Sequence, residues 1–152
     1  MENVHLLLPK KSRPCWSPQL AALNTQIQFV DIPLLGVVSA GVPVDICEQQ
    51  ESVRVPGHMV RKESYALKVK GHSMVEDGIQ DGDIIIVKRH TSAQNGQSVV
   101  ALINGEKTTL KKFYVEKEGI RLQPANAAMA PIFLQHHEVE ILGIVECVVR
   151  LP

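Results

Sequence analysis

A serine lies between a histidine and a methionine in the stretch Gly71-His72-Ser73-Met74, and its hydroxyl could act as a nucleophile. A serine hydroxyl is a poor nucleophile unless a neighbouring base removes its proton. Histidine and lysine are the bases to consider, and the chain contains both. The chemistry that this stretch allows therefore depends on which base can reach Ser73.

The sequence gives little support for a histidine as the base that activates Ser73. His72 is the chain neighbour of Ser73, and adjacent side chains in extended backbone point to opposite faces. The nucleophile elbow of many hydrolases requires Gly-x-Ser-x-Gly, whereas this chain reads Gly-His-Ser-Met-Val. Residue order alone does not exclude a Ser-His-Asp triad, but no motif supports one.

Two adjacent lysines, Lys111 and Lys112, offer the other kind of base. They lie in an expected strand, so one should face solvent and the other the opposite face, which could be buried. Burial lowers the pKa of a lysine, and a neutral lysine could deprotonate Ser73. The alternative is that both lysines lie on an exposed strand edge, where lysine discourages aggregation.

Short strands separated by turns must position these residues. Asp-Gly and Asn-Gly pairs punctuate the chain after residue 32, with a hairpin expected to turn at Asn104-Gly105, and no long helical period appears there. The expected strands are residues 64–71, 83–89, 97–105, 108–115, 120–126 and 139–151. We therefore predict a mostly β, small, curled and barrel-like domain.

Residues 1–32 differ from the remainder because prolines recur there and only one short helix, at residues 17–28, fits the pattern. A helix-turn-helix DNA reader needs several packed helices, so we expect no sequence-specific DNA binding from this segment. We expect residues 1–32 to form a partly disordered N-terminal arm and residues 33–152 to form the domain.

The amino-acid composition further limits the class of protein to which this chain can belong. The 152 residues, 45% of them hydrophobic, suit one compact domain, and Lys plus Arg equals Asp plus Glu at 16 each, so no net charge favours nucleic acid or an anionic membrane. Three widely spaced cysteines argue against a disulfide framework and a zinc site. Without a membrane-spanning run or a secretory leader, we expect a soluble, cytoplasmic protein.

Two clusters of potential metal ligands have simpler explanations. Asp77, Asp81 and Asp83 alternate with glycine, which fits turns better than metal ligation. The run His136-His137-Glu138 fits a solvated loop. We expect neither a metal nor a cofactor.

Four motifs in the same order resemble one family. Residues 71–89, 95–114, 120–132 and 141–149 look like the LexA/UmuD family of self-cleaving serine-lysine peptidase domains. The resemblance implies that Ser73 is the nucleophile and Lys111 the general base. The spacing between serine and lysine is one residue longer than usual, with the extra residue most simply placed in the hairpin end, so Lys112 is kept as a weaker candidate base.

The resemblance also implies a cleavage site in the segment LLGVVSAGVPV, a loop near residues 34–44. Members of the family cut themselves between a small residue and glycine, which here corresponds to Ala40-Gly41. A small alanine fits a shallow pocket, and Gly41 has no Cβ to obstruct the bend into the site. Backbone N–H groups of Ser73 and Met74 are then expected to hold the oxyanion. The alternative is that this segment is merely a loop.

Two roles fit the resemblance, and both belong to the SOS response to DNA damage. In a UmuD-like protein a short arm precedes the domain, and its cleavage activates an accessory subunit of an error-prone polymerase. In a LexA-like repressor the domain dimerises and, stimulated by a RecA filament on single-stranded DNA, cleaves itself. The expected arm favours the UmuD-like role, with a LexA-like or stand-alone regulatory domain as the alternative.

The carboxy-terminal segment is expected to make a homodimer. Its β-branched residues are more numerous than an exposed terminal strand should carry, so one edge or face is expected to meet a partner. These residues are Ile141, Ile144, Val145, Val148 and Val149. The resemblance implies the same contact, because domains of this family dimerise through their carboxy-terminal strands.

Overall fold

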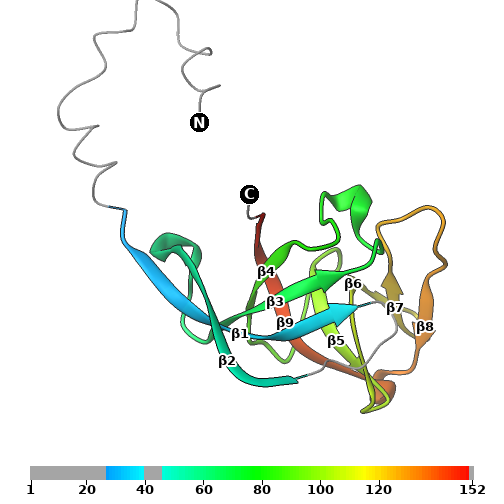
Figure 1. Ribbon diagram of the computed structural model, residues 1–152. Coiled ribbons are helices and arrows are strands. Elements are labelled where there is room, and N and C mark those ends of the chain that lie inside the picture. The colour runs from blue at the N-terminus through cyan, green and yellow to red at the C-terminus, as the bar shows by residue number, and fades with distance from the viewer. Residues whose placement is uncertain (1–26, 40–45, 151–152) are drawn as a thin grey trace, which may run out of the picture.

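A single sheet of nine strands forms the described part of the chain, which in this computed structural model is residues 27–39 and 46–150 (Figure 1). Its strand order is β2-β1-β3-β4-β9-β5-β6-β7-β8. The strands are β1 Phe29–Ser39, β2 Ile46–Pro56, β3 Ser64–Lys70, β4 Ile84–Lys88, β5 Ser98–Ile103, β6 Lys107–Glu116, β7 Gly119–Gln123, β8 Ile132–Leu134 and β9 Val139–Val149. The mostly β fold expected from the sequence is confirmed.

Helical structure is limited, within the described residues, to three single 3-10 turns. They are η2 Gly57–Met59, η3 Val75–Asp77 and η4 His136–Glu138. The expected helix at residues 17–28 and most of the expected arm lie outside the described residues. β1 begins at Phe29, so the expected boundary at residue 32 falls inside a strand, where Ile32 is buried.

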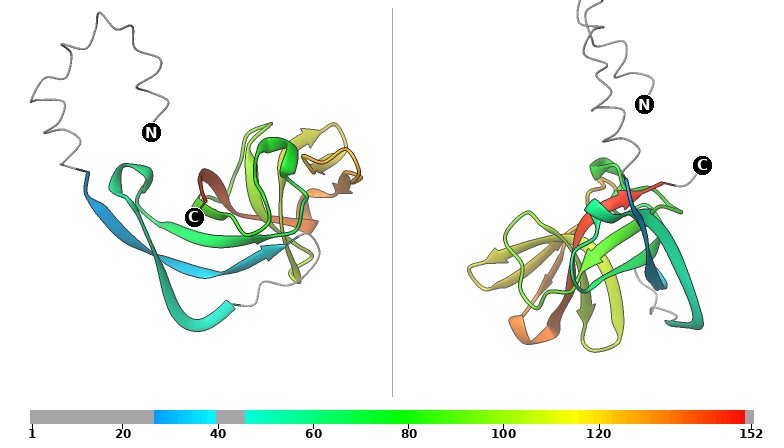
Figure 2. Two further views of the ribbon diagram at one scale, coloured as in Figure 1. Left: turned by 45° about the horizontal axis from the view of Figure 1, so that its top comes forward. Right: turned by 90° about the vertical axis from the view of Figure 1, so that its left-hand side faces the viewer.

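The sheet is strongly bent, as the two views of Figure 2 show. β1 and β2 form a long antiparallel hairpin whose open end projects from the body, and β1 also pairs in parallel with β3. One core cluster includes Val38 of β1, Met74 beside the candidate nucleophile and Leu110 of β6. The apolar core thus packs the three segments that carry the candidate site against one another.

The β5–β6 hairpin turns where the sequence predicts it. Ile103 pairs with Lys107, and the intervening turn includes Asn104 and Gly105, both with positive φ. Since the turn lies at the end of the hairpin, an additional residue there is absorbed without altering the strand pairing that follows.

β9 is divided between two neighbours. Residues 139–144 pair with β5, whereas residues 144–149 pair with β4. The second half of β9 therefore has, within the described part of the chain, one strand edge without a partner. Val148 in this half is 39% exposed.

Candidate active site

The segment after β3 places Ser73 at the edge of the core. Gly71 has a φ of 98°, a conformation that glycine adopts without strain, and its N–H donates to Asp81 Oδ1 at 2.7 Å. The chain then turns, so that Ser73 is 8% exposed and Met74 only 1% exposed. Ser73 is therefore held in a tight turn with its side chain against the protein interior.

The Leu110 carbonyl oxygen brings Ser73 and Lys111 together. The hydroxyl of Ser73 donates to this oxygen at 3.4 Å, and Lys111 Nζ donates to the same oxygen at 3.1 Å. Two side chains that lie 38 positions apart in the sequence (111 − 73) thus share one acceptor. The structure places the amine close to the hydroxyl that it is expected to deprotonate.

Lys111 is buried and its charge is uncompensated. It is 2% exposed, and no carboxylate of the described residues lies within ion-pair distance of its amine. Burial, and to a smaller extent the positive charge of Lys107, lower the pKa of Lys111 from the usual 10.5 to about 8. About a tenth of Lys111 is consequently neutral at pH 7, far more than for an ordinary lysine.

The hydrogen bonds of Lys111 suit the neutral amine. Nζ donates to Thr109 Oγ1 at 2.8 Å as well as to the Leu110 oxygen. A neutral amine has two N–H donors and one lone pair, so these two bonds use both donors. The lone pair is left free to accept a proton from Ser73, as a general base requires.

Lys112 has a different environment although it is the next residue. Its amine forms an ion pair with Asp77 Oδ2 at 3.0 Å, and its side chain is 29% exposed. The hydrogen bond to Asp77 raises the pKa of Lys112, which keeps this lysine protonated. Of the two candidate bases, the geometry favours Lys111.

The end of β1, which precedes the expected cleavage site in the sequence, lies beside the end of β3, which precedes Ser73. Val38 lies opposite Val69 and Ser39 lies opposite Lys70 in the parallel β1–β3 pairing. Lys70 precedes Ser73 by three positions in the sequence. Ala40 and Gly41 lie outside the described residues, but the strand before them runs alongside the strand before the serine.

The histidines and aspartates have other surroundings. Every histidine of the described part is exposed, and none there hydrogen-bonds Ser73. Asp77 pairs with Lys112, Asp81 accepts from Gly71, and Asp83 pairs with Arg150. Within residues 27–39 and 46–150 no group of three or more metal-ligating side chains gathers.

A second loop, between β7 and β8, contacts the segment that carries Ser73 (Figure 1). Asn126 Nδ2 donates to the His72 carbonyl oxygen at 2.8 Å, and the Glu76 N–H donates to the Ala125 oxygen at 2.8 Å. The Ala127 N–H also donates to the Glu76 carboxylate. The segment that carries Ser73 is therefore hydrogen-bonded to residues far along the chain, with Glu76 and Ala127 separated by 51 positions.

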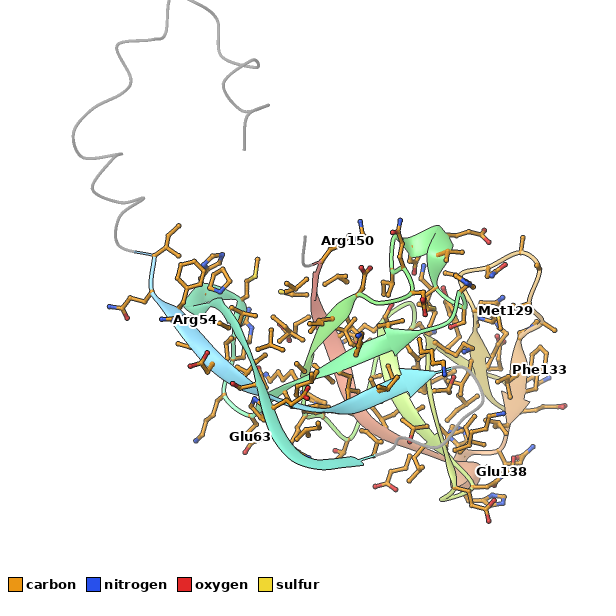
Figure 3. All side chains as sticks on the ribbon, viewed as in Figure 1. Arg54, Glu63, Met129, Phe133, Glu138 and Arg150 are labelled. Carbon is orange, nitrogen blue, oxygen red and sulfur yellow. The ribbon has the colours of Figure 1, made fainter. Side chains whose placement is uncertain are left out.

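Arg150, labelled in Figure 3, also contacts the segment that follows Ser73. Its guanidinium donates two hydrogen bonds of 2.8 Å to Asp83, which is 2% exposed, and one of 3.1 Å to the Gly78 oxygen. Hydrogen bonding to Arg150 holds the pKa of Asp83 below its usual value, so the buried carboxylate stays ionised. The end of β9 is thereby tied to the turn after Ser73.

Sequence reasoning missed three of these residues: Thr109, Asn126 and Arg150. Thr109 could have been found, because residues two apart on a strand share a face and Lys111 is two positions further on. Asn126 and Arg150 reach the site from elements far away in the sequence. No local pattern indicates either contact.

Membrane insertion by a helix has no support in the described residues, since none of their helices has the length and apolar character that a span requires.

Comparisons with known proteins agree on one family. Residues 33–146 match the family model described as Peptidase S24-like. A LexA repressor from Syntrophobacter fumaroxidans is 50% identical over 122 residues, which are 80% of this chain and 59% of that protein. LexA repressors from Clostridioides difficile and Myxococcus xanthus are 43% and 47% identical, over 82% and 80% of this chain and 60% and 58% of theirs. The chain thus spans about three-fifths of the length of these relatives.

Proposed function

The chain belongs to the Peptidase S24-like family, and from this premise we propose that it is a LexA-like serine peptidase that cuts its own Ala40-Gly41 bond. The observation that carries the proposal is the Leu110 carbonyl oxygen shared by Ser73 and the buried, uncompensated Lys111. A buried lysine without a counter-ion costs folding free energy, and such groups cluster at functional sites.

The proposed reaction begins with proton transfer from Ser73 to the neutral amine of Lys111. The Ser73 oxygen attacks the Ala40 carbonyl carbon, and the N–H groups of Ser73 and Met74 stabilise the oxyanion. As the Ala40–Gly41 bond breaks, the Lys111 ammonium protonates the departing nitrogen of Gly41. Water then hydrolyses the ester between Ala40 and Ser73, which restores the serine and leaves a carboxylate on Ala40.

Thr109 and Leu110 supply the acceptors that orient the Lys111 amine during these transfers. Because the amine cannot rotate freely once both N–H donors are engaged, its lone pair keeps one direction. Burial lowers the pKa toward the working pH, at which a general base transfers protons most efficiently. The same residue can therefore accept the proton of the serine and return it to the leaving group.

The relatives favour a repressor-type role over a polymerase accessory role. The three relatives are named LexA repressors. The UmuD-like expectation instead depended on the N-terminal arm, most of which lies outside the described residues. We propose that the domain serves the SOS response and that a RecA filament on single-stranded DNA stimulates its cleavage. Co-purification with an error-prone polymerase subunit would favour the accessory role instead.

Homodimerisation fits the same proposal. The second half of β9 has one strand edge that no described residue pairs, and Val148 there is 39% exposed. Edge strands readily pair with another chain, and a two-fold contact would match the segment with its own copy. Sedimentation of the intact chain tests this, with a monomer at all concentrations as the contrary result.

Self-cleavage is tested by incubating the purified chain with RecA, a nucleotide and single-stranded DNA, followed by intact mass spectrometry. The expected products are two fragments, one of which begins at Gly41. Ser73→Ala is the control and should remain whole under the same conditions. Cleavage of the control at the same bond would refute the proposed nucleophile, and products from another bond would refute the proposed site.

A further inference from the structure

The contact between Asn126 and His72 has a consequence for the peptide group that precedes the nucleophile. The His72 carbonyl and the Ser73 N–H belong to one peptide unit, and none of the described peptide bonds is cis. In a trans peptide the C=O and the N–H point in opposite directions and rotate together. Asn126 Nδ2, 2.8 Å from the His72 oxygen, therefore also fixes the direction of the Ser73 N–H.

The N–H groups of Ser73 and Met74 lack acceptors among the described residues, although Ser73 is 8% and Met74 1% exposed. Leaving a buried donor unpaired costs about 1–3 kcal/mol, so native structures retain few of them. The N–H groups of His72 and Val75 also lack acceptors within the described part of the chain, but these two residues are exposed to water, whereas the N–H groups of Glu76, Asp77 and Gly78 donate to backbone oxygens. Ser73 and Met74 thus carry the two buried donors without an acceptor among the described residues, and these donors flank the Ser73 hydroxyl, where an oxyanion would form.

We propose that Asn126 is a positioning residue for self-cleavage, which holds the His72–Ser73 peptide so that the Ser73 N–H points at the developing oxyanion. This inference rests on the proposed function. Asn126 makes no hydrogen bond to the Ser73 hydroxyl, and it acts through the peptide unit. The other two bonds between these loops, at Glu76, lie beyond the nucleophile and do not reach that unit.

The Asn126 side chain has a second contact that must be separated from the first. Its Oδ1 accepts from the Ala128 N–H at 2.9 Å and so shapes its own loop. Asn126→Asp keeps this acceptor and removes only the donor to His72. Asn126→Ala removes both the donor and the acceptor without adding a charge. Together the two variants separate the effect of losing the donor from a change in the loop and from the effect of an added charge.

Asn95 provides a matched control. Its Oδ1 accepts from the Val115 N–H at 2.8 Å, and an aspartate there keeps that acceptor. Asn95→Asp therefore makes the same chemical change as Asn126→Asp but at a site that contacts neither Ser73 nor Lys111. All variants are assayed at a temperature at which circular dichroism shows each to be folded.

The measurement is the first-order rate of self-cleavage as a function of pH, up to its plateau. We expect the plateau rate of both Asn126 variants to fall by about tenfold or more, since losing an oxyanion donor outright costs about 100- to 1,000-fold. Asn126→Ala should keep the wild-type pH midpoint, because Lys111 is untouched. Asn95→Asp should cleave like the wild type.

An unchanged plateau in either Asn126 variant would overturn the inference. So would a slower rate that comes only from a displaced midpoint, because Asn126 would then act on Lys111 rather than on the peptide. If the wild type does not cleave itself, or if Ser73→Ala does, the proposed function itself fails. If the wild type cleaves and an Asn126 variant cleaves at the same plateau rate, only the role of Asn126 fails.

Discussion

β1, which leads to the proposed cleavage bond, and β6, which carries the proposed base, differ in how firmly their neighbours hold them. β6 pairs with β5 and with β7 in uninterrupted register. β1 shifts its register with both β2 and β3 after Leu34, beside Gly36, whose φ is 150°. The start of the β1–β2 hairpin also projects from the body, with Phe29 52% exposed (Figure 2).

This difference suits a peptidase whose substrate is part of its own chain. A base and a nucleophile must stay aligned, because small displacements cost large factors in rate. A tethered substrate must instead enter and leave the site, and the register shifts of β1 leave its ladders with β2 and β3 locally interrupted. The fold therefore combines a firmly paired strand that carries the proposed base with a proposed substrate strand of looser pairing.

The largest expected effect comes from removing either the proposed nucleophile or the proposed base. Ser73→Ala and Lys111→Ala should each abolish self-cleavage, whereas Lys112→Ala should retain most of it because Lys112 is paired with Asp77 outside the site. Intact mass spectrometry over time gives the rates, and circular dichroism confirms the fold. Full cleavage by Lys111→Ala would show that the buried lysine is not the base.

The substrate part should be as sensitive at one position. Gly41→Glu should block cleavage, because a long, charged side chain would stand where the chain is proposed to bend into the site. Circular dichroism is used to check that the variant is folded. A normal rate in Gly41→Glu would contradict the assignment of the bond, while leaving the lysine test intact.

A smaller effect is expected from pH. With the pKa of Lys111 at about 8, the neutral fraction and hence the rate should rise about tenfold from about pH 7 to above about pH 9. Lys112→Ala should show the same midpoint, because the ion pair raises the pKa of Lys112. A rate independent of pH in a folded wild type would argue against a lysine base.

A further effect is expected on the pH dependence of stability, where the two lysines should act in opposite directions. The pKa of Lys111 is lowered in the folded chain, so the unfolded state binds more protons between about pH 8 and pH 10.5 and stability rises with pH. The pKa of Lys112 is raised, so its contribution is complete below the unfolded pKa and is lost as pH rises through the folded one.

Urea unfolding in the Ser73→Ala background measures this linkage. The difference between a pKa of 10.5 and one of about 8 corresponds to about 3 kcal/mol in the free energy of unfolding. This pH-dependent contribution should disappear when Lys111→Met is added. Adding Lys112→Met should change the pH dependence with the opposite sign. Identical pH dependence in the presence and absence of Lys111 would mean that burial does not perturb this lysine.

The sequence by itself determined much of the scaffold. Apolar patterns and Asn-Gly and Asp-Gly turns predicted strands β3 to β7, strand β9 and the hairpin turn at Asn104, but not the three-residue strand β8. These features follow from contacts between residues a few positions apart, which the local pattern records. The long β1–β2 hairpin was not predicted, because its strands lack a clear apolar alternation.

Only the tertiary structure decided which lysine is buried and what surrounds it. Four successive residues of β6, from Thr108 to Lys111, are buried, so alternation alone could not separate Lys111 from Lys112. The Ser73 hydroxyl meets the Leu110 oxygen across 37 residues, Asn126 reaches His72 across 54 and Arg150 reaches Asp83 across 67. Such contacts depend on how distant strands pack, because burial and hydrogen bonding are properties of the assembled core rather than of any short stretch of chain.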